Sequence, residues 1–105
     1  MTAYLPTFIS APDDAYDHAV AAATAARVVA RPGPRILGVH LEGPFLSPSW
    51  PGAHDPQHLQ TPSPALIERL ARAGPIALVT LAPELGAAAD PRVRAASAVP
   101  ARLLC

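Results

Sequence analysis

A histidine and a glutamate two residues apart are the first candidates for chemistry in this 105-residue sequence. His40 lies in an apolar run, ILGVHL at residues 36–41, and Glu42 follows it directly. The length of this run suits a buried β-strand. Side chains two apart on a strand share a face, and Glu42 would lie at the C-terminal edge, where parallel α/β folds gather their catalytic groups. From position alone, a solvated loop glutamate and a satisfied core histidine are the more ordinary interpretation.

The other histidines do not form a zinc motif. The His-x-Glu pair also occurs in nucleobase deaminases, but their signature needs a later Pro-Cys-x-x-Cys, and this chain has one cysteine, Cys105. His54 and His58 have the four-residue spacing of a zinc-binding helix, yet Pro56 between them opposes a helix. A two-histidine metal site is therefore not expected. By itself, His54 is a loop histidine that could contact a substrate.

Three apolar runs predict the strands that would position these residues. They occupy residues 3–9, 36–41 and 76–81, and Pro6 interrupts the first. Glu84 closely follows the third strand as Glu42 follows the second, and it ranks below Glu42 as a candidate for the same edge.

Two segments with helical spacing alternate with these strands. The first runs from Asp13 to about Ala30, with Ser10 in the capping position, and carries His18 on its surface. The second begins after Ser63 as N-cap and ends at Gly74. Strand and helix in alternation indicate an α/β fold with a parallel sheet and right-handed crossovers.

The remaining segments are a long loop and a tail. Residues 43–61 hold four prolines and two glycines and predict an irregular loop, of a length that is functional or disordered in compact domains. Residues 86–105 are rich in alanine and arginine and carry little structural information. Because a parallel sheet of three strands leaves unpaired edges and a complete (β/α)8 barrel needs about 250 residues, we expect only part of a barrel wall.

Composition restricts the partners and the compartment. Eight basic and eight acidic residues give a formal net charge of zero, which argues against nucleic acid and anionic membranes as partners. A single cysteine excludes an internal disulfide and fits a reducing compartment, so the cytoplasm is expected. The sequence has neither a signal-peptide pattern nor an apolar stretch of membrane-spanning length, and a soluble protein is expected.

Several short motifs resemble one enzyme family in the same order. The run ILGVHLEGPFLS at residues 36–47, followed by GAHDP at 52–56, is similar to the N-acetylglucosamine-6-phosphate deacetylases of the metal-dependent amidohydrolases. TAYLPT at residues 2–7 and VTLAPE at 79–84 resemble flanking strands of that family. The resemblance covers residues 1 to about 85, which we expect to be a partial amidohydrolase barrel, and leaves residues 86–105 as a divergent tail.

The resemblance implies a fold, a reaction and three site residues. It implies a fragment of a (β/α)8 barrel, with about three parallel strands and intervening helices, from an enzyme that hydrolyses the N-acetyl group of N-acetylglucosamine 6-phosphate to glucosamine 6-phosphate and acetate. Glu42 matches the ligand of a divalent metal, zinc by preference, with iron or another divalent ion as alternatives. Ala53 and His54 match a pair that touches the amino-sugar phosphate. His40 receives no ligand role.

The resemblance also implies that other parts of the site lie elsewhere. The family's histidine ligands and its aspartate acid/base match no position here, so no catalytic residue is assigned and the isolated chain is expected to be inactive. The parent enzyme could be a homo-oligomer. Two alternatives stay open: another hydrolase of the amidohydrolase superfamily, and a non-enzymatic remnant that binds sugar phosphates.

Overall fold

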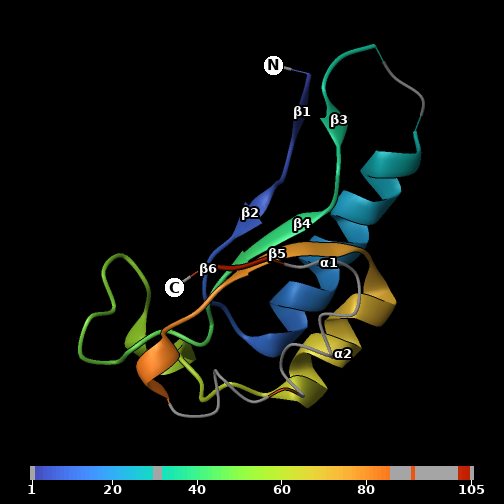
Figure 1. The fold of residues 1–105 in the computed structure, drawn as a ribbon. Helices are drawn as coiled ribbons and strands as arrows, with labels where there is room; N and C mark the ends of the chain where they lie inside the picture. Colours follow the sequence, from blue (N-terminus) through green and yellow to red (C-terminus); the bar gives the residue numbers. More distant parts are fainter. Residues whose placement is uncertain (1, 30–31, 86–90, 92–101, 105) are drawn as a thin grey trace.

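The chain folds as parallel strands covered on one face by two helices (Figure 1). A computed structural model describes residues 2–29, 32–85, 91 and 102–104. The strands are β1 (Ala3–Tyr4), β2 (Thr7–Phe8), β3 (Arg35–Ile36), β4 (Val39–Glu42), β5 (Ile76–Thr80) and β6 (Arg102–Leu104). The helices are α1 (Asp13–Val28) and α2 (Pro64–Ala73), with single 3-10 turns at η1 (Pro56–His58) and η2 (Pro83–Leu85).

The strands form a four-stranded parallel sheet in the order β2-β4-β5-β6 and a two-stranded parallel extension, β1-β3. The predicted α/β class and parallel pairing are therefore confirmed. About three strands were predicted, whereas the main sheet has four. The additional strand, β6, lies in the tail and pairs with β5 through Val79 and Leu103. Its neighbours at residues 86–90, 92–101 and 105 lie outside the described part of the chain.

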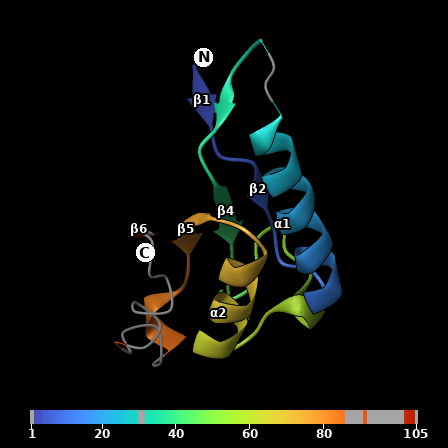
Figure 2. The same ribbon diagram turned by 90° about the vertical axis from the view of Figure 1, so that its right-hand side faces the viewer.

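Two of the predicted strands are each divided in two. Tyr4 pairs with Ile36 and Thr7 pairs with His40. From the first pair to the second, the chain advances three residues between β1 and β2 but four residues between β3 and β4. The extra residue makes a bulge, and Pro6 at the break has no N–H to donate. Figure 2 shows β1 and β3 extending beyond the helices, while β2 and β4 lie against them. The bulge explains why residues 36–41 show no clean alternation.

The first helix begins differently from its prediction. Pro12 is the N-cap of α1 and no side chain caps it, so the capping role predicted for Ser10 is wrong. The Ser10 hydroxyl instead lies 2.8 Å from Nδ1 of His54, a partner 44 residues away. In the second helix, α2, Ser63 accepts a hydrogen bond from the Leu66 N–H at 3.3 Å, which confirms the predicted N-cap.

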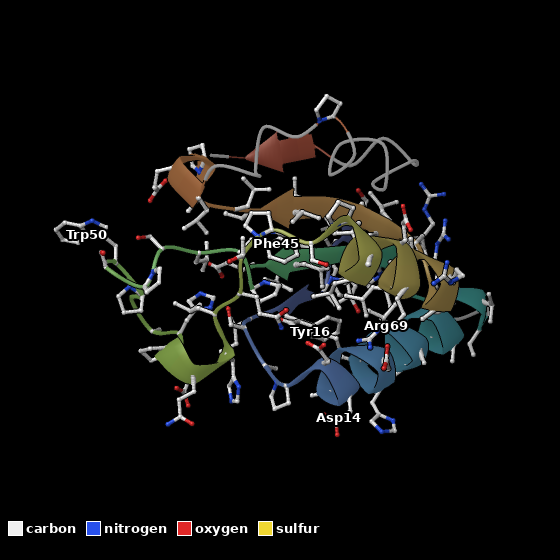
Figure 3. All side chains as sticks on the ribbon, turned by 90° about the horizontal axis from the view of Figure 1, so that it is seen from below. Asp14, Tyr16, Phe45, Trp50 and Arg69 are labelled. Atoms are coloured by element: carbon white, nitrogen blue, oxygen red, sulfur yellow. The ribbon has the colours of Figure 1, made fainter. Side chains whose placement is uncertain are left out.

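One apolar core joins the helices to the inner face of the sheet. Tyr16 and Phe45, labelled in Figure 3, lie in this interior and are each 1% exposed. The rest of this core comes from α1, β4, α2 and β5 with the segment after it: Val20, Ala23, Val39, Leu41, Leu66, Ile67, Leu70, Ile76, Val79 and Leu81. Because α1, α2, β4 and β5 all contribute, the position of the β4 end depends on these four elements together.

An arginine fixes the two helices to each other. Arg69 of α2 lies between them (Figure 3), with Nε 3.6 Å from Asp17 and Nη2 3.9 Å from Asp13, both on α1. Gln60, just before α2, also donates to Asp13 at 2.7 Å. These contacts hold the end of the long loop against the first turn of α1. Among the described residues, no helix has the length and apolarity needed to cross a bilayer.

Candidate functional site

Glu42 lies at the carboxyl end of β4, on the face of the sheet opposite the helices. Burial alternates along this strand: Val39 and Leu41 are buried, while His40 and Glu42 are only partly covered. The two-residue spacing therefore places His40 and Glu42 on one face, as expected. The Glu42 side chain is 45% exposed, so its carboxylate remains accessible.

His54 comes from the long loop and lies beside Glu42. Its side chain is 7% exposed, and Nε2 lies 3.8 Å from Oε1 of Glu42, which is beyond hydrogen-bond distance. On the other side of the ring, Nδ1 accepts from the Ser10 N–H at 3.2 Å and lies 2.8 Å from the Ser10 hydroxyl. A turn closed by the His54 N–H on the Pro51 carbonyl, at 3.0 Å, sets the ring in this place.

Gly43 leaves the space in which Ser10 meets His54. Its φ of +84° belongs to the left-handed region, and a Cβ built there would lie 2.5 Å from the Ser10 Oγ. Glycine is therefore required both by the backbone and by the neighbouring hydroxyl. Its N–H donates to the Thr80 carbonyl at 3.0 Å, which continues the pairing of β4 with β5 immediately after Glu42.

The rest of the long loop is more exposed. Ala53 precedes His54 at the surface, and Trp50 is 83% exposed and projects from the loop (Figure 3). Asp55 caps η1 by accepting from the Gln57 N–H at 2.9 Å, and it lies 3.9 Å from Nε2 of His58. A 3-10 turn thus replaces the helix that a His54 and His58 zinc pair would need.

His40 has a hydrogen-bonding partner for each ring nitrogen. Nδ1 lies 3.0 Å from the Thr7 hydroxyl on β2, and Nε2 lies 2.8 Å from the Thr80 hydroxyl on β5. The ring therefore connects the three adjacent strands β2, β4 and β5, two residues before Glu42 on β4. Sequence reasoning missed this link, although each threonine lies within a predicted strand.

The two weaker candidates lie at the surface. Glu84 is an exposed residue of η2, and His18 is exposed on α1. Within the described ranges, no cluster of three or more histidine, cysteine, aspartate or glutamate side chains has the arrangement of a metal site. The accessible carboxylate of Glu42 fits one ligand position for a divalent ion, since carboxylate oxygen binds zinc together with nitrogen ligands.

Tyr16 contacts the segment that carries Ser10, and its buried phenol should make the free energy of unfolding depend on pH in the alkaline range. Burial raises the pKa of its phenol above the usual 10.0, an effect that hydrogen bonds with Ala11 and Ser10 partly offset. Above pH 10 the unfolded chain loses this proton first. The free energy of unfolding should therefore fall, by up to about 1.4 kcal/mol per pH unit, until the folded-state pKa is passed.

Urea unfolding between pH 8 and 11 measures this effect, and Tyr16→Phe should flatten the decline. Tyr4→Phe is the matched control, because Tyr4 is 41% exposed and should leave the decline unchanged. An equal decline in Tyr16→Phe would contradict the assignment.

Known proteins similar to this chain share one activity class. No family model matches the sequence. Human N-acetylglucosamine-6-phosphate deacetylase is 39% identical over 90 residues, which cover 82% of this chain and 22% of that enzyme. A Shewanella N-acetylgalactosamine-6-phosphate deacetylase is 40% identical over 88 residues, covering 79% of this chain and 21% of that enzyme. This chain thus spans about a fifth of the length of these relatives.

The folded structure gives the same result. A variant of the N-acetyl-D-glucosamine-6-phosphate deacetylase from Mycobacterium smegmatis, solved in complex with N-acetyl-D-glucosamine 6-phosphate, superimposes with a TM-score of 0.76 and 32% identity. The superposition covers 97% of this chain and 26% of that protein. The sequence and structure comparisons therefore both match this chain to part of amino-sugar-phosphate deacetylases.

Proposed function

We propose, on the premise that this chain is homologous to one segment of the N-acetylglucosamine-6-phosphate deacetylases, that it supplies part of the active site of such an enzyme. The reaction is hydrolysis of the N-acetyl group of N-acetylglucosamine 6-phosphate. The observation that carries the proposal is the accessible carboxylate of Glu42 at the carboxyl end of β4, beside the buried ring of His54.

The proposed architecture is one part of a (β/α)8 barrel. Four parallel strands, with both helices on one face, have the arrangement of a barrel wall with its outer helices. In that arrangement the opposite face, with His40 and Glu42, faces the barrel interior. Residues 1–85 are proposed as a partial amidohydrolase barrel, and residues 86–105 as a tail with a more divergent sequence.

Glu42 is proposed as a ligand of a divalent metal ion, with zinc preferred and iron as an alternative. When bound, such an ion polarises an amide carbonyl and makes a water molecule more acidic. Glu42 would contribute the hard oxygen ligand and a negative charge. Ala53 and His54 would contact the sugar, Ala53 at the surface of the loop and His54 through the ring edge that faces Glu42.

Other features of the proposal concern the whole enzyme. The proposed partner is a small amino-sugar phosphate, and the proposed assembly is a homo-oligomer. The proposed compartment is the cytoplasm, because a single cysteine suits reducing conditions. The similarity to the Shewanella enzyme makes N-acetylgalactosamine 6-phosphate the substrate to compare, since the two sugars are epimers.

Manganese binding tests the role of Glu42 in the 105-residue chain. Mn²⁺ broadens NMR signals of nuclei near it, and it binds oxygen ligands. Titration should broaden the amide signals of residues 41–43 and 54, and Glu42→Gln should remove that broadening because it removes the charged oxygens.

Glu68→Gln is the matched control, since Glu68 is an exposed glutamate on α2. It should leave the signals around Glu42 as broad as in the unmodified chain. Broadening near residues 41–43 that survives Glu42→Gln, in a chain with an otherwise unchanged amide spectrum, would show that Glu42 is not the ligand.

A further inference from the structure

We propose that Ser10 is a positioning residue that keeps the ring proton of His54 on Nε2. His54 then acts as an N–H donor beside Glu42 rather than as a second metal ligand. The inference rests on the proposed function for the identity of the site, and it goes further by assigning the tautomer and the residue that sets it.

The argument begins with the direction of one hydrogen bond. The backbone N–H of Ser10 lies 3.2 Å from Nδ1 of His54 and can only donate, so Nδ1 must accept. A neutral imidazole has one accepting nitrogen and one N–H, which places the proton on Nε2. The Ser10 hydroxyl, 2.8 Å from the same nitrogen, provides a second donor.

Helix α1 fixes Ser10 in its place. The Ala11 N–H donates to the Tyr16 hydroxyl at 3.2 Å, and this hydroxyl also contacts the side chain of Ser10. The Tyr16 oxygen accepts from Ala11 and lies beside the Ser10 side chain, which keeps Ser10 next to His54. Because Ser10 is 5% and Tyr16 1% exposed, water competes little with these contacts.

This pattern is opposite to that of a histidine bound to a metal. A metal-bound ring usually donates its other N–H to a carboxylate or carbonyl oxygen, whereas the other nitrogen of His54 faces donors from Ser10. The Nε2–H points instead toward Oε1 of Glu42, 3.8 Å away.

The tautomer can be measured without metal or substrate. Long-range ¹H–¹⁵N correlation of the chain with ¹⁵N-labelled histidine distinguishes bare from protonated ring nitrogens, and His54→Gln identifies the His54 signals among the four histidines. We expect a bare Nδ1 and a protonated Nε2. A protonated Nδ1 with a bare Nε2 in the unmodified chain overturns the proposal, whatever the variants do.

Substitution of Ser10 then tests its positioning role. Ser10→Ala keeps the backbone donor to Nδ1 and loses the hydroxyl, so Nε2 should remain the main position of the proton while both ring-nitrogen signals shift part of the way toward the average of the two tautomers. Ser10→Thr restores a hydroxyl and should restore the original shifts. A His54 tautomer unchanged in folded Ser10→Ala contradicts the role of the hydroxyl, while a uniform loss of stability without a ring-nitrogen shift indicates a structural role alone.

Addition of Zn²⁺ separates this inference from the proposed function. The Nε2 proton should stay in place at saturating zinc, and its displacement overturns the assignment of His54 as a donor. If zinc leaves the Glu42 region unaffected while Nε2 remains protonated, the proposed metal role of Glu42 fails and the inference about Ser10 is supported.

Discussion

Replacing Gly43 with alanine is expected to lower the free energy of unfolding by about 3 kcal/mol. Two effects add. A left-handed backbone disfavours any Cβ, and the new methyl group would meet the Ser10 Oγ at 2.5 Å and Leu46 at 3.4 Å. Ser10 cannot withdraw without breaking its contacts with His54. Urea denaturation followed by far-ultraviolet circular dichroism measures the loss.

Gly52→Ala is the matched control for the backbone term. Gly52 has a φ of +58°, yet a Cβ there would have no atom within 4 Å. It should lose only about 1 kcal/mol, the left-handed term alone. The double variant Ser10→Ala with Gly43→Ala should recover part of the loss, because the clashing oxygen is absent. Equal losses for Gly43→Ala and Gly52→Ala would refute the packing argument.

Replacing Glu42 with glutamine should reduce deacetylation by at least about 100-fold in an enzyme that contains this segment. Loss of residues that only hydrogen-bond metal ligands reduces activity by about 10- to 100-fold, and loss of a ligand should exceed that. The measurement uses the Mycobacterium smegmatis enzyme with its homologous segment replaced by this chain, and compares kcat/KM for both epimeric sugar phosphates.

Glu84→Gln is the control in the same chimera. Glu84 follows β5 as Glu42 ends β4, but it is exposed on η2, so its substitution should change kcat/KM by less than about twofold. The isolated 105-residue chain, with metal supplied, should release no acetate. Full activity of the Glu42→Gln chimera would exclude a ligand role, and turnover by the isolated chain would contradict the proposal that the site is shared with other segments.

Much of the fold follows from local sequence. The residues of β5 and α2 were predicted closely, because an apolar run of strand length and a Ser-Pro start are decided by neighbouring residues. The division of residues 36–41 into β3 and β4 was not predicted. It depends on pairing with residues about 30 positions earlier in the chain, where Pro6 separates β1 from β2.

The contacts of the site were harder to predict than its members. Glu42, Ala53 and His54 were chosen from motif resemblance, and their functional roles remain predictions. Ser10 was assigned to a helix cap because its distance from α1 suits one, whereas its actual partner is His54. A serine side chain can form either kind of hydrogen bond, so its partner is decided by whether the long loop places His54 next to it.

The sequence alone therefore determined the alternation of strands and helices, the strand end at Glu42, and the kind of enzyme that this segment resembles. These depend on side-chain pattern and short motifs, which are local. Tertiary structure decided that His54 lies against Glu42, that His40 is bound by Thr7 and Thr80, and that Gly43 leaves room for Ser10. His54 and Glu42 are 12 residues apart and the other pairs more than 30, and their approach is set by packing of the shared core.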